Sequence, residues 1–323
     1  MVPHGRQTNY RKPRVTQVNV KRSQTIALVV STFTLGLGFP AGKILLRTIP
    51  PIALVAWRFI AAALFVAVVA QVADRGRHRV PIGKVATIGA LQTAAVMGLL
   101  YTGMKDLSGG TSAILLFTNP IWVGALSPLF LKEKINTTKI VSLVFGFIGI
   151  VVLLGGISSK GSLKPVFMVL GASLAWAIST IVSKKLPRDT SSWWVSTYQM
   201  GIGGLGLLLL SLFLHQRYPI HQTASAWFWM FVLTVPCTAL GFGLWQFGLR
   251  HGDATRASTF LFLVPFFAVV LSTIILREKV LPYEAIGAAL IIGALLISSR
   301  KIKTVDETTQ LITQRANGDG SQL

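Results

Sequence analysis

The chain has 323 residues, of which 52% are hydrophobic and 13% charged, and its formal net charge is +21. Soluble domains carry about 25% charged residues, so this composition excludes an ordinary soluble protein and indicates a chain surrounded mostly by lipid. Short stretches of alternating hydrophobicity, which a transmembrane β-barrel would need, do not occur in the sequence.

Ten apolar blocks follow one another along the chain, each of roughly the twenty residues that cross a ~30 Å hydrocarbon core. They span residues 25–46, 51–72, 82–104, 109–131, 138–157, 163–183, 191–214, 226–249, 254–276 and 282–299. The sequence therefore predicts an all-α integral membrane protein with ten transmembrane helices. Polar tails are expected at 1–24 and 300–323, and the first block is expected to be an uncleaved helix because no cleavage site is evident.

The basic residues are divided unequally between the connecting segments. With the N-terminus placed inside, 22 of the 31 Lys and Arg residues fall in cytoplasmic segments, 8 fall outside, and Arg58 lies within a helix. Lys and Arg are retained on the cytoplasmic side of membranes. Both termini are therefore predicted to be cytoplasmic, with the protein in the cell membrane, and the charge is a topology signal that argues against nucleic acid as a partner.

The two halves of the chain repeat each other. At an offset of 145 residues Thr93 meets Thr238, Pro120 meets Pro265, and LKEK at 131–134 meets LREK at 276–279. An offset of 141 aligns the earlier helices. The predicted units are residues 25–157 and 163–299, and because each has five crossings the second is upside down relative to the first. Inverted repeats of this kind are typical of transporters.

Several of these segments also resemble a known family. The stretch WQFGLRHGDATRAS at 245–258, followed by Val264-Pro265 and LREK at 276–279, is similar to the EamA branch of the drug/metabolite transporter superfamily. LGLGFPAGK at 35–43 stands in place of its W-G-S-N-F-V-A-I-K segment, with Leu35, Leu37 and Gly38 replacing the usual Trp, Ser and Asn. Arg58-Phe59 matches an R-F pair, and 175–177 resembles a W-A motif. The resemblance implies ten helices, a central cavity, and export or exchange of amino acids or similar metabolites.

Polar and aromatic residues inside the apolar blocks are the candidates for a transport site, because polar groups are costly in a membrane. The candidate substrate-binding residues are Lys43, Gln92, Tyr101, Asn119, Trp176, Trp245 and Gln246. Tyr101 and Gln246 are repeat partners. For Lys43 a gate or substrate contact and an interfacial anchor stay open. A structural role is favoured over a carboxylate contact for Arg58, since its repeat partner Gln199 is uncharged.

Pro120 and Pro265 interrupt the fourth and ninth blocks at matching positions. Each removes the hydrogen-bond donor for a carbonyl four residues earlier, at Leu116 and Leu261. Interrupted helices in corresponding positions point to a transporter's site, so both prolines are assigned a gating role, with a plain packing kink as the alternative.

The sequence offers no catalytic motif and no metal or cofactor site, and the glycine-rich run 201–206 is expected to be a helix-packing face. We therefore expect a transporter whose partners are a small-molecule substrate and membrane lipids, with a homodimer left open. A membrane enzyme and a non-transporting scaffold or sensor are the rival functions. All ten acidic residues and all five histidines lie in loops, tails or helix ends, which predicts facilitated diffusion or exchange of a neutral, zwitterionic or anionic solute.

Overall fold

The structure is a computed structural model that describes residues 14–74, 80–131, 137–158, 162–187, 190–219, 221–250, 260–261, 263–294 and 296–297. Within these ranges all regular secondary structure is helical. Seven helical spans are long and apolar enough to cross a membrane, and shorter apolar helices occur at Leu143–Val152, Leu263–Leu276 and Pro282–Ala294. The all-α membrane architecture is thus confirmed, while the count of ten crossings stays a prediction.

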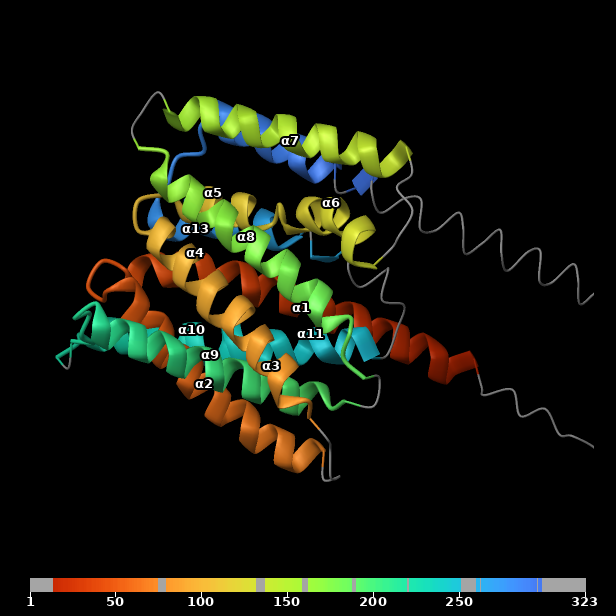
Figure 1. The fold of residues 1–323 in the computed structure, drawn as a ribbon, viewed down its shortest axis with the longest axis vertical. Helices are drawn as coiled ribbons and strands as arrows, with labels where there is room; N and C mark the ends of the chain where they lie inside the picture. Colours follow the sequence, from red (N-terminus) through yellow and green to blue (C-terminus); the bar gives the residue numbers. More distant parts are fainter. Residues whose placement is uncertain are drawn as a thin grey trace, which may run out of the picture.

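The described part of the first half consists of α-helices and one π-helical segment, arranged as in Figure 1. They are α1 (Arg14–Leu45), α2 (Pro51–Ala73), α3 (Ile82–Ile88), the π-helical η1 (Gly89–Ala95), α4 (Val96–Met104), α5 (Gly109–Leu116), α6 (Asn119–Leu131) and α7 (Thr137–Ser158). α1 begins within the segment predicted as a polar tail, and its apolar part begins at Ser23. The fourth predicted block is two helices, because the chain leaves the helix at Phe117 and Thr118.

The second half follows the same plan. Its elements are α8 (Lys164–Ser183), α9 (Ser192–Phe213), α10 (Ala224–Thr234), the π-helical η2 (Val235–Leu240), α11 (Gly241–Arg250), α13 (Leu263–Leu276) and the helix Pro282–Ala294. The N-termini of α9 and α10 are capped by Ser191 and Thr223, whose side-chain oxygens accept from Trp194 N and Ala226 N. Such caps satisfy backbone donors that a helix start leaves unpaired.

The two π-helical segments lie at repeat-related positions. A shift of 145 residues carries η1, at 89–95, onto 234–240, which is η2 with one additional residue. π-Helical turns are rare and occur frequently at functional sites. The sequence predicted the repeat but not this local widening of the third helix in each unit.

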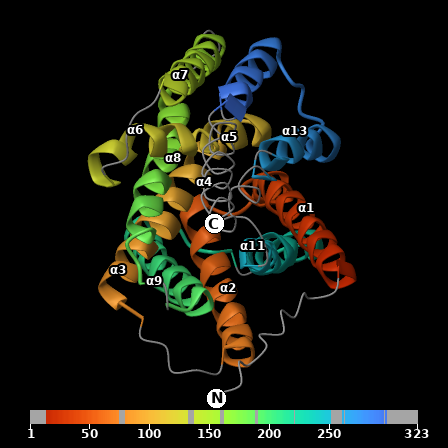
Figure 2. The same ribbon diagram turned by 90° about the vertical axis from the view of Figure 1, so that its right-hand side faces the viewer.

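Helices of the two predicted units interlock. α2 packs along α9, α1 along α13 and α11, and α4 along α8. α7 and the helix Pro282–Ala294 lie together at one end of the bundle, as Figure 2 shows. A Cβ on Gly149 of α7 would lie 2.8 Å from the Ile291 side chain, so these two helices are in close contact.

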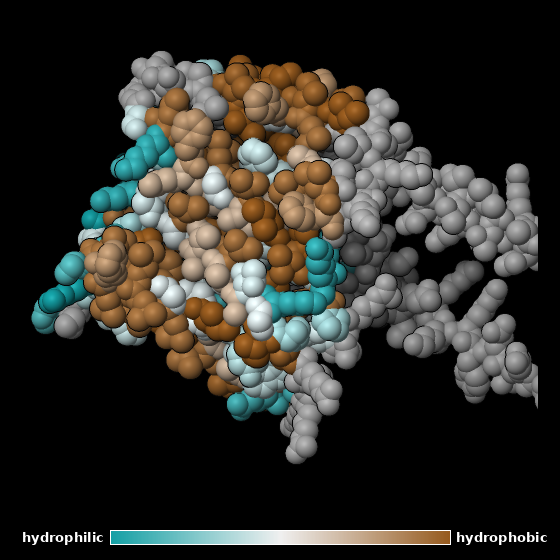
Figure 3. Space-filling view, viewed as in Figure 1, coloured by the Kyte–Doolittle hydropathy of each residue, from teal (hydrophilic) through white to brown (hydrophobic). Residues whose placement is uncertain are grey.

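The outer surface of the bundle is strongly apolar. Hydrophobic residues cover most of the described face in Figure 3. Leu64 of α2 and Leu209 and Phe213 of α9 are 67%, 69% and 78% exposed. Large exposed apolar side chains also occur on other helices of the bundle, so its surface is suited to contact with lipid.

The glycine-rich run on α9 is a packing face in its centre only. A Cβ on Gly203 would lie 2.5 Å from the carbonyl oxygen of Gly89 in η1, and one on Gly204 would lie 3.1 Å from Ile60 on α2. The expected packing role is confirmed for these two glycines. Gly206 differs, because a Cβ there would meet nothing within 4 Å.

Candidate functional site

A cavity of about 640 Å³ lies between the helices of both halves. Its polar lining residues are Arg58, Gln92, Asn119, Thr180, Ser183, Thr190, Ser192, Ser196 and Gln199. Its aromatic lining residues are Phe39, Tyr101, Phe117, Trp176, Phe242 and Trp245. The site therefore combines flat apolar rings with hydrogen-bonding groups, which is the usual composition of a small-molecule pocket.

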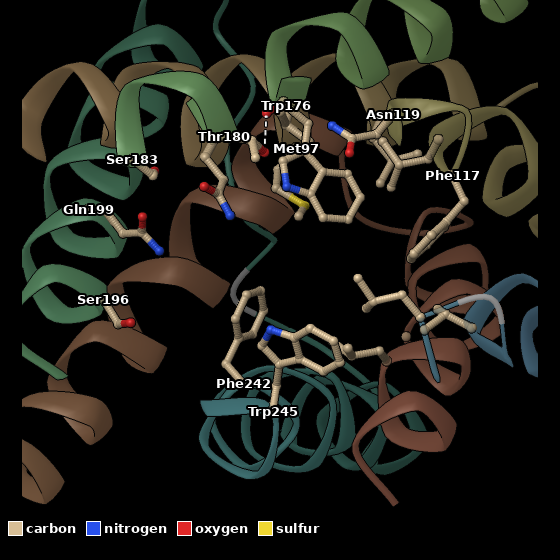
Figure 4. A pocket seen from close by; sticks show the side chains of 18 of the residues that line it. Met97, Phe117, Asn119, Trp176, Thr180, Ser183, Ser196, Gln199, Phe242 and Trp245 are labelled. Carbon is tan, nitrogen blue, oxygen red and sulfur yellow. Dashed lines mark hydrogen bonds between the residues drawn. The ribbon is translucent and has the colours of Figure 1, made fainter. Parts of the chain in front are cut away.

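Two tryptophans form facing walls of the cavity. Trp176 projects from α8 and Trp245 from α11, on opposite sides of the space in Figure 4, with Phe242 beside Trp245. The rings of Trp176 and Phe117 pack edge-to-face, with centroids 5.4 Å apart and an interplanar angle of 81°. This contact holds the Trp176 ring in place at the cavity wall.

Amide and hydroxyl groups occupy other parts of the wall. Gln92 lies in η1, and its Oε1 accepts a 3.0 Å hydrogen bond from Ser179 Oγ. Gln199 and Ser196 project from α9 toward the same space, and Asn119 lies across from them near Trp176 (Figure 4). The Asn119 Nδ2 donates a long hydrogen bond of 3.5 Å to the Ser173 carbonyl.

Arg58 is buried in the wall of the cavity and connects three helices. Its side chain leaves α2, donates from Nε to Thr238 Oγ1 of η2 at 2.8 Å, and donates from Nη1 to the Tyr101 hydroxyl of α4. Thr238 in turn donates to the Leu233 carbonyl at 2.7 Å. The expected structural contacts of Arg58 are therefore present, and the residue also lines the cavity.

Lys43 does not line the cavity. Its Nζ donates to the carbonyl oxygens of Met104, Lys105 and Leu107 at 2.8, 2.8 and 2.6 Å. These carbonyls lie at and just beyond the end of α4, where a helix leaves acceptors unpaired. These bonds anchor α1 to the end of α4. Whether Lys43 is also a gate or substrate contact, or an interfacial anchor, stays a prediction.

A carboxylate lies close to this anchor. Glu278 accepts hydrogen bonds from the Gly109 backbone N–H at the start of α5, at 3.2 and 3.0 Å. Burial raises the pKa of Glu278, while the Gly109 N–H and the charge on Lys43 act in the opposite direction. Glu284 accepts from Thr111 of the same helix. The segment after α13 is thus tied to the first half of the chain.

The two prolines stand at the starts of helices that follow breaks, and neither lines the cavity. Pro120 is exposed as the second residue of α6, and Pro265 is buried as the third residue of α13. The residues that flank the breaks do line the cavity: Leu116, Phe117, Asn119, Leu261 and Val264. The prediction of an interrupted helix is confirmed in the fourth block, where α5 and α6 are separate helices and not one kinked rod. In the ninth block the described chain has a turn at Leu261, and α13 begins at Leu263.

The remaining candidates divide into three groups. Gln92, Tyr101, Asn119, Trp176 and Trp245 line the cavity. Lys43 does not. The side chain of Gln246 lies outside the described part of the chain, so its candidate role in substrate binding stays a prediction.

Sequence reasoning missed the small polar residues of the site. Trp176, Thr180 and Ser183 recur at the spacing i, i+4, i+7 along α8, and Ser192, Ser196 and Gln199 do the same along α9. This spacing places each set on one helix face. A polar stripe on an apolar helix was therefore the signal that could have found them.

The described helices thus form an apolar bundle around a cavity with polar and aromatic walls, as expected of a membrane protein with an internal binding site. The sequence model of the EamA-like transporter family matches the chain twice, over residues 23–155 and 163–300. The chain belongs to the EamA-like transporter family and is a membrane transporter.

The chain is similar over most of its length to proteins named as transporters. The uncharacterized transporter YvbV of Bacillus subtilis is 26% identical over 285 residues, which are 87% of this chain and 93% of YvbV. An uncharacterized transporter of Archaeoglobus fulgidus is 26% identical over 284 residues, which are 87% of this chain and all of that protein. A solved crystal structure superposes with a TM-score of 0.59 at 17% identity, covering 87% of this chain and 97% of its own, and it shows a common fold.

Proposed function

We propose that this transporter moves small polar metabolites across the cell membrane, and that amino acids or related solutes are its favoured substrates. The observation that carries the proposal is the cavity of about 640 Å³ with its aromatic and amide lining. Its volume lies within the ~300–1,000 Å³ typical of small-molecule sites. Trp176 and Trp245 suit the apolar part of a solute, and Gln92, Asn119 and Gln199 suit its polar groups.

We further propose that transport proceeds by alternating access of two inverted units, residues 25–157 and 163–299. The double match of the family model, the repeat-related π-helical segments and the repeat-related helix breaks support this organisation. The cavity lies between the two units, where exchange of their conformations would open it to one side and then the other.

The described conformation fits an inward-facing state. The cavity lining extends to Leu186, Pro187 and Thr190, in the connection predicted to be cytoplasmic. At the opposite end Lys43 joins α1 to the end of α4, and Glu278 joins the segment after α13 to the start of α5. These contacts would form the outer closure, and they would separate when the outer side opens.

A membrane enzyme is a weaker alternative. Such an enzyme would need acid, base or metal-binding groups gathered at one place. Among the described residues no group of three His, Cys, Asp or Glu could hold a metal ion. The one charged side chain in the described cavity lining is Arg58. A cavity without carboxylate or histidine in that lining also favours exchange or facilitated diffusion over proton coupling.

The proposal is tested by counterflow in proteoliposomes that contain the purified protein and a pool of unlabelled amino acids. The readout is the uptake of labelled amino acids, compared with the uptake by liposomes that contain no protein. Ser183→Trp, which would insert an indole ring into the cavity, is expected to lower uptake strongly. Ile178→Trp is the matched control on α8, because Ile178 is 37% exposed and is not a lining residue. Equal uptake by both variants and by the wild type would refute transport through this cavity.

A further inference from the structure

Arg58 is the one charged side chain among the described residues that line the cavity. It is the eighth residue of α2, which places its Cα about 10 Å along the helix at 1.5 Å per residue. The residue is 5% exposed. An ionisable group buried this far along a predicted membrane-spanning helix is a candidate functional residue.

The hydrogen bonds of Arg58 orient the guanidinium without saturating it. Nε is held by Thr238 and Nη1 by Tyr101. An arginine carries five N–H donors in a planar fork, so these two bonds use fewer than half of the donors of a side chain that lines the cavity.

Among the described residues that line the cavity, none carries a negative charge that would compensate Arg58. The four acidic residues in the described ranges are Asp74, Asp106, Glu278 and Glu284. None of them lines the cavity. Arg58 donates to two hydroxyl groups, and its Cζ lies 5.0 and 5.6 Å from the ring centroids of Phe59 and Tyr101. A buried charge without a counterion is strongly unfavourable. A ligand that brings a negative group would supply the missing charge, with the bidentate geometry that arginine favours.

We infer that Arg58 binds the carboxylate of the transported solute, and that Thr238 and Tyr101 position it for this purpose. The inference rests on the proposed function and narrows its substrate class to small carboxylates with an apolar body, such as neutral amino acids. The facing rings of Trp176 and Trp245 then hold that body. A solute in which the carboxylate is replaced by an amide or removed is discriminated against.

The test measures ligand binding, separately from transport. Equilibrium dialysis of the purified wild type is carried out with three probes of the same body: L-leucine, L-leucinamide and 3-methylbutylamine. The same comparison is made with L-phenylalanine, L-phenylalaninamide and 2-phenylethylamine. In at least one series the acid is expected to bind about tenfold or more tightly than the amide and the amine, as for one charge-assisted hydrogen bond pair.

Arg58→Gln is expected to remove this preference, while Arg217→Gln keeps it. Arg217 is an exposed loop arginine outside the cavity, so it controls for loss of one positive charge. A purely structural Arg58 would behave differently. Its replacement would lower the melting temperature without ligand and leave the ratio of acid to amide affinity unchanged, which would overturn the inference.

Two further outcomes are decisive. If Arg58→Gln does not fold, the comparison is made with Arg58→Lys, which keeps the charge but loses the planar fork. An affinity of Arg58→Lys for the acid equal to that of the wild type overturns the inference. A wild type that binds neither acid more tightly than its amide also overturns it. Arg58-dependent acid binding without counterflow would refute only the proposed transport, and counterflow without that dependence would refute only the role of Arg58.

Discussion

Replacing Gly203 with alanine tests how closely α9 must approach the π-helical segment η1. A Cβ at this position would lie 2.5 Å from the Gly89 carbonyl oxygen and closer still to Thr93 Cβ. Both neighbours belong to the backbone or to the root of a side chain, so neither can turn away. α9 or η1 must therefore shift, and η1 carries the cavity residue Gln92.

Gly206→Ala is the matched control on the same helix, since nothing lies within 4 Å of its Cβ position. Alanine is favoured over glycine in a helix by about 1 kcal/mol, and both variants share this gain. The difference between them isolates the steric clash, which we expect to be about 1–3 kcal/mol, the usual range for overpacking.

Thermal unfolding in one detergent, followed by tryptophan fluorescence at one scan rate, measures this difference. One kcal/mol corresponds to about 2–4 °C for chains of 150–250 residues. Gly206→Ala should melt at or above the wild type, and Gly203→Ala should melt several degrees below Gly206→Ala. A Gly203→Ala variant that melts with or above Gly206→Ala would show that α9 and η1 do not meet at this glycine.

Two further predictions concern the contacts around Lys43 and Glu278. Lys43→Met removes three hydrogen bonds to carbonyl oxygens and is expected to lower stability by about 1–3 kcal/mol, whereas Lys105→Met, at an exposed residue, should melt like the wild type. Burial raises the pKa of Glu278, so the folded protein binds this proton more readily than the unfolded chain. The stability that the folded protein gains from binding this proton is therefore lost as the pH rises through the raised pKa of Glu278. Glu278→Gln should flatten that part of the profile of melting temperature against pH, and an unchanged profile would contradict the assignment.

The apolar blocks predicted most helices of the fold because a backbone in lipid must pair its own polar groups, which a helix does locally. The same local rule explains what was missed. A π-helical turn at Gln92 or Thr238 changes the pairing by one residue and leaves composition unchanged. The break between α5 and α6 was placed close to its observed position because proline acts on the backbone of its own segment.

The site was predicted less completely, because its contacts join distant parts of the chain. Arg58 reaches Thr238, 180 residues away, and Lys43 reaches carbonyls 61 to 64 residues away. The hydroxyl of Thr180 donates to the Trp176 carbonyl one turn earlier. Because a threonine can satisfy its hydroxyl in this way, its presence in an apolar helix does not indicate whether it lines a cavity. Only its spacing from Trp176 and Ser183 carried the information.

The helix breaks lead to the prediction that bears most directly on motion. Pro120 has no N–H, and the preceding turn is completed by short-range bonds, from Thr118 N to Leu115 O at 3.3 Å and from Ile121 N to Thr118 O at 2.8 Å. In the other half Val264 N donates to Leu261 O at 3.0 Å, just before Pro265. Alanine at either proline restores a donor for the carbonyl four residues earlier, which would join the two helices into one rod.

Because the residues flanking both breaks line the cavity, straightening the helices would move its walls and oppose the exchange of conformations. We therefore expect Pro120→Ala/Pro265→Ala to insert into the membrane like the wild type and to lose counterflow at least several-fold. Each single variant should lose less, since one break remains. Pro219→Ala, in a loop outside the cavity lining, serves as the control. Full counterflow by the double variant would reduce both prolines to packing residues and would leave the breaks without a part in transport.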